Sequence, residues 1–414
     1  MQESLHDDGA MSSTSPGFFS EPVLRMKPSA TMEVAQLARD LKAGGRDIIS
    51  LSTGEPDFDT PAHIVEAAHR AALEGKTRYP PVQGVPELRQ AVSAKLRREN
   101  GVTIAPQDVI VSSGAKQAIS NALIATMNPG DEVIIPAPCW VSYPELVLML
   151  GGRPVFARPR APRFALSPED LERAITPRTK WLLLNSPGNP GGTTYSPGEL
   201  QALGDVLRRH PHVHVMTDDI YEYLVYGGAR FTTFAQAVPD LADRTLVING
   251  VSKAFAMTGW RIGYAAGRGD LIKAMTKVQS QLSSGANTVA QWAAVAALEG
   301  PRGQIEAFVR TYDERRRLAA DILSASAGLA CPLPEGAFYL FPDCTALIGR
   351  RTRNGVPIDG DAAFARELLN AHGVAVVPGA AFGTPGHFRA SFATRTDALE
   401  EACRRIQRFC ASLE

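Results

Sequence analysis

The sequence has no surplus of either charge, few cysteines and no long hydrophobic run. Its 43 lysines and arginines balance 43 aspartates and glutamates, so it lacks the basic surplus typical of proteins that bind nucleic acid or anionic membranes. No apolar run approaches the roughly 18 residues that a membrane-spanning helix needs. The five cysteines include no C-x-x-C pair, which argues against a disulfide framework or a zinc cluster. We therefore expect reduced thiols and neither a nucleic-acid nor a membrane partner.

The first residues and the histidines carry no clear functional signal. Residues 1–20 are rich in Ser, Gly and Asp and lack the apolar core of a secretory signal, so we expect a flexible extension on a cytoplasmic protein. His210, His212 and His214 alternate in HPHVH, where two histidines on one strand face could begin a metal site. Because no carboxylate or thiol cluster accompanies them, we interpret them as the edge of a structural element and predict no metal site.

What is present is enough apolar sequence for well-packed domains. Of 414 residues 44% are hydrophobic, and a chain of this length is expected to form about two domains. Aliphatic runs alternate with helical patterns in the middle of the chain, which predicts an α/β fold with one large, mostly parallel sheet between helices. The seven predicted strands are Val109–Val111, Glu132–Pro136, Pro154–Ala157, Trp181–Leu184, Val213–Met216, Thr245–Ile248 and Ile262–Ala265. Ligands of such sheets bind beyond the carboxyl ends of the strands.

The pattern changes near residue 301. A long charged helix (TYDERRRLAADILSA) is followed by short strands around GAFYLF and GVAVVPG and by a final helix. Near the other end of the chain, an amphipathic helix begins around Thr31 and stops at a Gly-Gly pair. We predict a large domain over 56–300 and a smaller α+β domain built from 21–55 and 301–414.

Chemically informative residues follow several predicted strands. The motif SSGAKQA (112–118) opens a helix with small residues whose backbone N–H groups suit a phosphate. Asp218 and Tyr221 follow another strand, although an N-cap and core packing are their structural alternatives. Lys253 ends an apolar strand, where a lysine is costly unless its charge is used or lost; desolvation makes such an amine nucleophilic.

Three further residues complete the pattern. Asn189 lies in the turn NSPGNPGG, Arg261 lies eight residues after Lys253, and Arg389 lies on a predicted strand in FRASFATR. Together the motifs require a ligand with a phosphate, a carbonyl for the lysine and a group that an aspartate keeps protonated. Pyridoxal 5′-phosphate meets all three requirements.

The chain resembles the class I aminotransferases, which are fold-type I pyridoxal phosphate enzymes. Within them it is similar to the bacterial and plant group that includes aspartate and prephenate aminotransferases. The resemblance runs from about Met26 to the C-terminus and implies a large domain with a seven-stranded, mostly parallel sheet. It is carried, in order, by STGEPDFDTP, YPPVQGVPELR, GAKQA, PCWVSYPE, NSPGNPGG, DDIYE, SKAFAMTGWRIGY and VAVVPGAAFG.

The resemblance also implies roles for individual residues. The catalytic residues would be Lys253, which would bond to the cofactor and move a proton, Asp218 at the pyridine nitrogen, and Tyr221 at the phenolic oxygen. Further cofactor contacts would come from Gly114, Ala115, Trp140, Asn189, Ser252, Arg261 and, reaching across a homodimer with shared active sites, Tyr79. The substrate-binding residues would be Gly54, Trp140, Asn189, Arg389, Lys116 and Thr31.

The resemblance favours a dicarboxylic substrate, since Lys116 and Thr31 match residues that recognise the distal carboxylate in this group. Aspartate or glutamate, with 2-oxoglutarate or oxaloacetate, would then react by ping-pong kinetics, and prephenate is a further candidate. A solvated Lys116 is the structural alternative. An aminotransferase for aromatic or aliphatic amino acids and a β-lyase on the same scaffold stay open. The zero net charge and the short segment before the resemblance disfavour a DNA-binding regulator.

Three positions depart from the pattern of the resembled family. Gly191 replaces the usual threonine of NPTG, Cys139 stands where relatives often carry an aromatic residue, and Thr53 stands where many have alanine. These differences concern the shape of the pocket and leave the predicted reaction unchanged.

Overall fold

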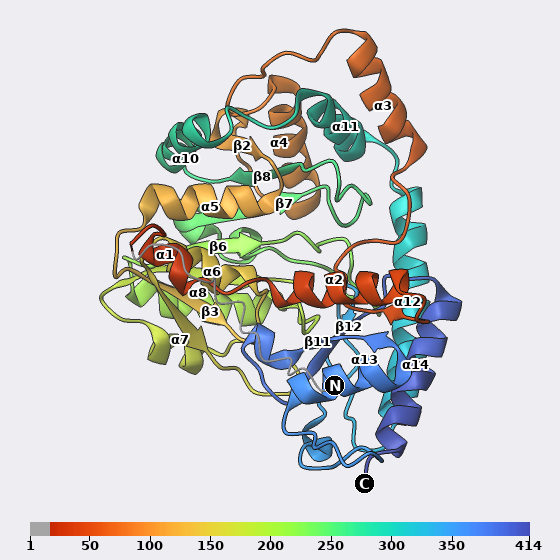
Figure 1. Cartoon of the computed structure of the whole chain (residues 1–414). Helices are drawn as coiled ribbons and strands as arrows, with labels where there is room; N and C mark the ends of the chain where they lie inside the picture. The colour runs from red at the N-terminus through yellow and green to blue at the C-terminus, as the bar shows by residue number, and fades with distance from the viewer. Residues whose placement is uncertain (1–16) are drawn as a thin grey trace.

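A seven-stranded sheet is the main element of the computed structural model, which describes residues 17–414 (Figure 1). Most of the expected N-terminal extension, residues 1–16, lies outside the described residues. The sheet has the order β2-β8-β7-β6-β5-β3-β4 and is parallel except that β8 runs antiparallel to both of its neighbours. Its strands are β2 (Val109–Ser112), β3 (Glu132–Pro136), β4 (Arg153–Ala157), β5 (Thr179–Asn185), β6 (His214–Asp218), β7 (Thr245–Gly250) and β8 (Gly263–Ala266). This confirms the predicted α/β class and the mostly parallel sheet.

The reversed direction of β8 follows from its connection. Parallel neighbours need a long crossover, usually a helix, whereas antiparallel neighbours can be joined by a short loop. Residues 251–262, between β7 and β8, contain no helix, so the chain turns back beside the strand it has just left. This loop carries Lys253 and Arg261.

Helices cover both faces of the sheet. Strand β2 illustrates the consequence for the sequence, because its side chains are buried on both faces. Val109 and Val111 pack into one hydrophobic cluster, whereas Ile110 points to the opposite face and joins another. A strand buried on both faces has no polar side to expose. The helices over 56–300 are α3 (Ala62–Leu73), α4 (Pro86–Asn100), α5 (Ala115–Thr126), α6 (Ser142–Met149), α7 (Pro168–Ala174), α8 (Pro197–Arg209), α9 (Phe234–Ala237), α10 (Gly269–Leu282) and α11 (Thr288–Glu299).

The remaining elements bring residues 21–55 together with the segment after residue 301. Strand β1 (Ile49–Ser50) pairs in parallel with β10 (Val374–Ala375), and a small antiparallel sheet has the order β11-β12-β9. The long helix α12 packs along α14, as Figure 1 shows. These elements are α1 (Glu21–Arg25), α2 (Ala30–Ala43), α12 (Gly303–Ser324), β9 (Tyr339–Leu340), α13 (Asp361–His372), β11 (Val377–Pro378), β12 (Phe388–Ser391) and α14 (Thr396–Ala411), and four short 3₁₀ helices span Pro106–Asp108, Pro239–Arg244, Thr345–Leu347 and Gly379–Phe382.

The boundaries between the two domains stay a prediction. All seven strands of the main sheet fall within 56–300, and the smaller sheets draw only on the segments on either side. Within residues 17–414, no helix combines the length and apolar character needed to cross a membrane.

The histidines and cysteines occupy ordinary structural positions. His210 contacts Glu172 at 2.7 Å and His212 contacts the Thr176 carbonyl at 3.1 Å, both in the turn that leads into β6. In the described part of the chain, no three His, Cys, Asp or Glu side chains gather as a metal-binding group. All five cysteines are free and buried.

Candidate active site

One cavity of about 360 Å³ collects nearly all of the predicted site residues. It lies beyond the carboxyl ends of β5, β6 and β7, where those strands face β9 and β12. Of the predicted residues, Gly114 is adjacent to the wall, and Tyr79 lies elsewhere. The predicted residues that line the cavity are Thr31, Gly54, Ala115, Lys116, Trp140, Asn189, Asp218, Tyr221, Ser252, Lys253, Arg261 and Arg389.

Lys253 lies in the cavity, and its surroundings lower the pKa of its amine. Its Nζ donates a hydrogen bond to the Gly54 carbonyl at 2.6 Å. Burial, followed by the nearby charges of Arg389 and Arg261, lowers the pKa of Lys253 to about 8, although Glu55 opposes the shift. A lysine with such a pKa has a far larger neutral, nucleophilic fraction near physiological pH than an ordinary lysine, although most of it is still protonated there.

Asp218, the last residue of β6, is a buried acid with neutral hydrogen-bond donors. The Tyr143 hydroxyl donates to Oδ2 at 2.6 Å, and the Ile220 N–H donates to Oδ1 at 3.3 Å. Burial raises the pKa of Asp218, and the Tyr143 hydrogen bond opposes the rise. A cationic partner would stabilise this carboxylate far more than neutral donors do.

The start of α5 lies beside the guanidinium of Arg261, an arrangement suited to binding an anion. Gly114 precedes the helix with φ +82°, and a Cβ at this position would collide with the Arg261 guanidinium. The first N–H groups of a helix lack intrahelical partners and attract anions. Arg261 donates from Nη1 to the Thr258 carbonyl at 2.9 Å, which fixes the guanidinium beside those groups. The left-handed backbone favours glycine at position 114, and the absence of a Cβ leaves room for the guanidinium in its present position.

Arg389 is a buried cation with part of its hydrogen-bonding capacity unused. Its side chain projects from β12 and is 1% exposed. Nη1 donates to Asn189 Oδ1 at 3.0 Å and Nη2 donates to the Ser52 carbonyl at 2.6 Å, whereas the buried Nε has no partner. Burial lowers the pKa of Arg389. A buried guanidinium without an anionic partner is costly, so the site favours binding of an anion.

Tyr221 lies against a residue that the sequence analysis missed. Its hydroxyl forms a 2.8 Å hydrogen bond with the hydroxyl of Tyr339 on β9. Both phenols are buried. Burial raises the pKa of Tyr221 well above its usual value, so this phenol keeps its proton.

Lys116 and Thr31 also line the cavity. Lys116 Nζ lies 4.7 Å from the centroid of the Trp140 ring. Although Lys116 is an exposed residue, the partial burial of its ammonium and then the charge of Arg261 lower its pKa. Thr31 comes from α2, and its buried Oγ1 has no hydrogen-bond partner. Both residues therefore offer unused donors to a ligand.

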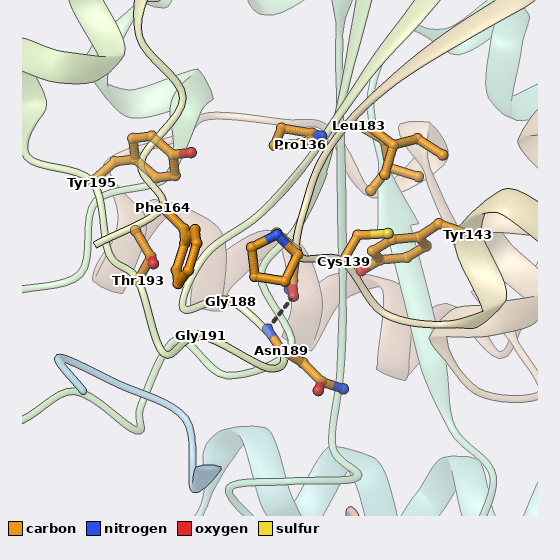
Figure 2. A pocket seen from close by; sticks show the side chains of 13 residues that line it. Pro136, Cys139, Tyr143, Phe164, Leu183, Gly188, Asn189, Gly191, Thr193 and Tyr195 are labelled. Atoms are coloured by element: carbon orange, nitrogen blue, oxygen red, sulfur yellow. Dashed lines mark hydrogen bonds between the residues drawn. The ribbon is translucent and has the colours of Figure 1, made fainter. Parts of the chain in front are cut away.

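The turn that carries Asn189 adjoins a smaller pocket, shown in Figure 2. The Asn189 N–H donates to Asn185 Oδ1 at 2.8 Å, and its side chain points away from this pocket. A Cβ on Gly191 would meet Thr193 Oγ1 at 3.5 Å and Phe164 at 3.8 Å, which are ordinary contact distances. Packing in this turn therefore does not require glycine at position 191.

Thr53 and Cys139, the other two positions that depart from the family pattern, differ in whether they line the cavity. Thr53 lines it beside Gly54. Cys139 is buried and lines the smaller pocket instead, and burial raises the pKa of its thiol to about 12.

Tyr143 and Tyr339 are the main site residues that sequence reasoning missed. Tyr143 follows Trp140 by three residues in PCWVSYPE, at the start of α6, so the motif already contained it. Tyr339 stands within the apolar run GAFYLF, and this run predicts only a strand. Tyr79, in contrast, was expected to act in a second subunit; it is 92% exposed and lines no part of its own chain's cavity.

Comparison with known proteins places the whole arrangement in one family. The family described as "Aminotransferase class I and II" matches residues 46–406. An aspartate/prephenate aminotransferase from Cereibacter sphaeroides is 53% identical over 96% of this chain and 99% of its own. The crystal structure of an aspartate aminotransferase from Rhizobium meliloti superposes with a TM-score of 0.93 and 46% identity over 96% of this chain and 99% of that one, and a Thermus thermophilus aspartate aminotransferase solved with maleate gives 0.88 and 43% over 94% and 99%. The chain therefore belongs to the class I and II aminotransferases, enzymes that depend on pyridoxal phosphate.

Proposed function

We propose that this chain exchanges an amino group between L-aspartate or L-glutamate and 2-oxoglutarate or oxaloacetate, with prephenate as a further acceptor. The observation that carries the proposal is the presence of two cationic side chains, Arg389 and Lys116, on the wall of one cavity that also contains Lys253. Two cations suit a substrate with two carboxylates. The names of the relatives from Cereibacter and Rhizobium support the same substrate class.

The residues around Lys253 fit pyridoxal phosphate. The α5 N-terminus, Ser252 and Arg261 would hold the phosphate, since Gly114 leaves the room that this contact needs. Asp218 would pair with the ring nitrogen, whose positive charge would oppose the effect of burial on the carboxylate. Tyr221 and Asn189 would bind the phenolic oxygen, and Trp140 would cover the ring. When bound, the cofactor supplies a carbonyl that condenses with amines and a ring that accepts electrons.

Lys253 would act both as nucleophile and as proton carrier. Its pKa of about 8 makes the neutral amine available, and that amine can accept a proton from the substrate α-carbon and donate it back. Nζ donates to the Gly54 carbonyl at 2.6 Å, and Arg389 lines the same cavity. The lysine and the proposed ligand of the α-carboxylate would therefore act in one cavity.

Arg389 would fix the α-carboxylate of the substrate. Two of its nitrogens are already held by Asn189 and Ser52, so the guanidinium does not have to be ordered when the substrate binds. The backbone at Gly54 would complete this contact. A preorganised cation of this kind holds the α-carbon near the lysine and spares the entropy of ordering.

Lys116 and Thr31 would recognise the distal carboxylate. The ammonium and the unpartnered hydroxyl line the same cavity as Arg389. The ring of Trp140 contributes a cation–π contact that keeps the ammonium at the wall. An amino acid with an uncharged side chain would leave both groups without a partner.

We also propose that two copies of the chain form a homodimer with shared active sites. Tyr79 lies in a loop between α3 and α4 and is 92% exposed. This is consistent with a tyrosine that completes the phosphate site of a second copy. The family resemblance supplies the role, and the exposure leaves the side chain free for it.

A panel of amino donors against three oxo acids tests the substrate proposal. We expect the specificity constants of aspartate and glutamate to exceed those of alanine, leucine and phenylalanine, with 2-oxoglutarate, oxaloacetate and prephenate as acceptors. Higher values for aromatic or aliphatic donors would reassign the specificity. Release of ammonia in place of amino transfer would identify a lyase.

A further inference from the structure

We propose that Tyr339 is a positioning residue with two separable contacts: its hydroxyl directs the proton of Tyr221, and its ring supports the guanidinium of Arg389. This inference rests on the proposed function, in which Tyr221 serves the cofactor and Arg389 serves the substrate. Tyr339 lies between them on β9 and is 1% exposed. It therefore links the cofactor side of the cavity to the carboxylate side.

The hydroxyl contact has only one arrangement that leaves Tyr221 free to serve the cofactor. The two phenolic oxygens are 2.8 Å apart, and either can donate in the structure described here. A phenol has a single proton, so Tyr221 cannot donate to Tyr339 and to a cofactor oxygen at once. When Tyr221 donates to the cofactor, Tyr339 has to donate to Tyr221. That second hydrogen bond polarises the Tyr221 hydroxyl and makes it a stronger donor.

The ring contact limits how the Arg389 guanidinium is oriented. Arg389 Cζ lies 4.4 Å from the centroid of Tyr339 and 5.0 Å from that of Phe382. A cation against aromatic faces in a buried site is stabilised more strongly than one in water. Because Nη1 and Nη2 already have partners, this stacking holds the unpartnered Nε in a fixed direction.

Two features of the chain keep Tyr339 in this position. Tyr339 pairs with Ser391 on β12, the strand that also carries Arg389, so a short sheet fixes the spacing between the two side chains. Gly54 leaves space for the hydroxyl, since a Cβ at position 54 would lie 2.5 Å from the Tyr339 oxygen. The same glycine accepts the hydrogen bond from Lys253 through its carbonyl.

Two substitutions separate the contacts. Tyr339→Phe keeps the ring and removes the hydroxyl, so it should weaken Tyr221 as a donor and leave Arg389 supported. Tyr339→Leu removes both contacts. The matched control is Tyr226→Phe, because Tyr226 is also buried, donates to the Ala337 carbonyl and lies against an arginine, with Arg316 Cζ 4.6 Å from its centroid, yet lines no part of the cavity.

The experiment uses the protein loaded with pyridoxal phosphate and two measurements other than turnover. The first is the pH midpoint of the visible absorbance change. A weaker Tyr221 donor leaves more negative charge on the phenolic oxygen, which favours the protonated chromophore, so Tyr339→Phe should raise this midpoint by on the order of half a pH unit. The second is the dissociation constant of maleate by calorimetry. It should stay within about twofold in Tyr339→Phe and weaken about tenfold in Tyr339→Leu.

Each result supports or overturns a stated part of the proposal. An unchanged midpoint in folded Tyr339→Phe would overturn the hydroxyl contact, and unchanged maleate binding in Tyr339→Leu would overturn the ring contact. Tyr339→Met replaces the leucine variant if circular dichroism shows that the latter does not fold. Equal shifts in Tyr226→Phe would show a general effect of buried phenols and also overturn the proposal. A wild-type protein that develops no pH-dependent visible band with the cofactor would instead refute the proposed function itself.

Discussion

Replacing Lys116 with methionine should damage turnover of dicarboxylic substrates selectively. Methionine keeps most of the aliphatic length of lysine and a good helix propensity in the first turn of α5, but removes the ammonium. In the proposed complex that ammonium faces the distal carboxylate, and the Trp140 ring lies 4.7 Å from Nζ. The substitution therefore removes a charge partner while leaving the cofactor contacts in place.

The structure limits the size of the expected effect. Removing one partner of a hydrogen-bonded charge pair costs about 2–5 kcal/mol when the pair is buried. Lys116 is exposed, and exposed ion pairs contribute only about 0.2–1 kcal/mol, so we expect a loss between the two classes, about 1–2 kcal/mol. At about 1.4 kcal/mol per decade this is roughly a five- to thirtyfold loss in kcat/KM for aspartate.

The assay compares aspartate with alanine as amino donors, because alanine has no distal carboxylate. Alanine turnover should change little in the Lys116 variant. Lys42→Met provides the control, since Lys42 is an exposed lysine in the last turn of α2 and lines no part of the cavity. Equal losses for the two donors would show that Lys116 serves the fold or the cofactor and would refute the assigned role.

Three further predictions follow from single features of the structure. Because burial lowers the pKa of Lys253 to about 8, the rate at which the unloaded protein forms its covalent bond with pyridoxal phosphate should rise with pH and level off above about 8; a midpoint near the usual lysine value would contradict the buried environment. Gly191→Ala should raise the free energy of unfolding in urea by about 0.4–1 kcal/mol, because a Cβ meets only ordinary contacts and the unfolded chain loses freedom; destabilisation would show that this turn needs glycine. If sites are shared, a Tyr79→Ala chain and a Lys253→Ala chain, each inactive as a homodimer, should regain activity as a verified heterodimer with one intact site; no regained activity would place Tyr79 in its own chain's site.

The large sheet could be predicted from sequence because its strands are buried on both faces. Runs such as Val109–Val111 lack polar alternation and end at turn residues, so their positions were clear. The structure extends four of the seven predicted strands by one to three residues, shifts two of them by one or two residues and leaves Glu132–Pro136 unchanged. The direction of β8 could not be predicted, because it depends on how the loop after Thr245–Gly250 returns and not on the apolar pattern of the strand.

The cavity residues that could be predicted from sequence are those that lie at or just after the end of a strand. Asp218 is the last residue of β6, and Lys253 follows the end of β7. Because ligands of parallel sheets bind beyond the carboxyl ends of the strands, both residues are expected at one site, and both line the cavity. Tyr339 escaped prediction because its partner Tyr221 is 118 positions away, in the turn that follows β6, and no local pattern encodes that contact. Lys116 shows the same limit, since its position against the Trp140 ring is a contact between two segments that no local pattern encodes.

The half-reaction with an amino donor alone tests the central claim most directly. Protein loaded with pyridoxal phosphate is mixed with L-aspartate in the absence of any oxo acid, and cofactor absorbance, oxaloacetate and ammonia are followed together. We expect one equivalent of oxaloacetate per site and stoichiometric conversion of the cofactor to its pyridoxamine form, with no ammonia, and no such conversion in Lys253→Ala. Continuous release of ammonia, or full conversion in the Lys253 variant, would contradict the assignment of Lys253 as the catalytic lysine of an aminotransferase.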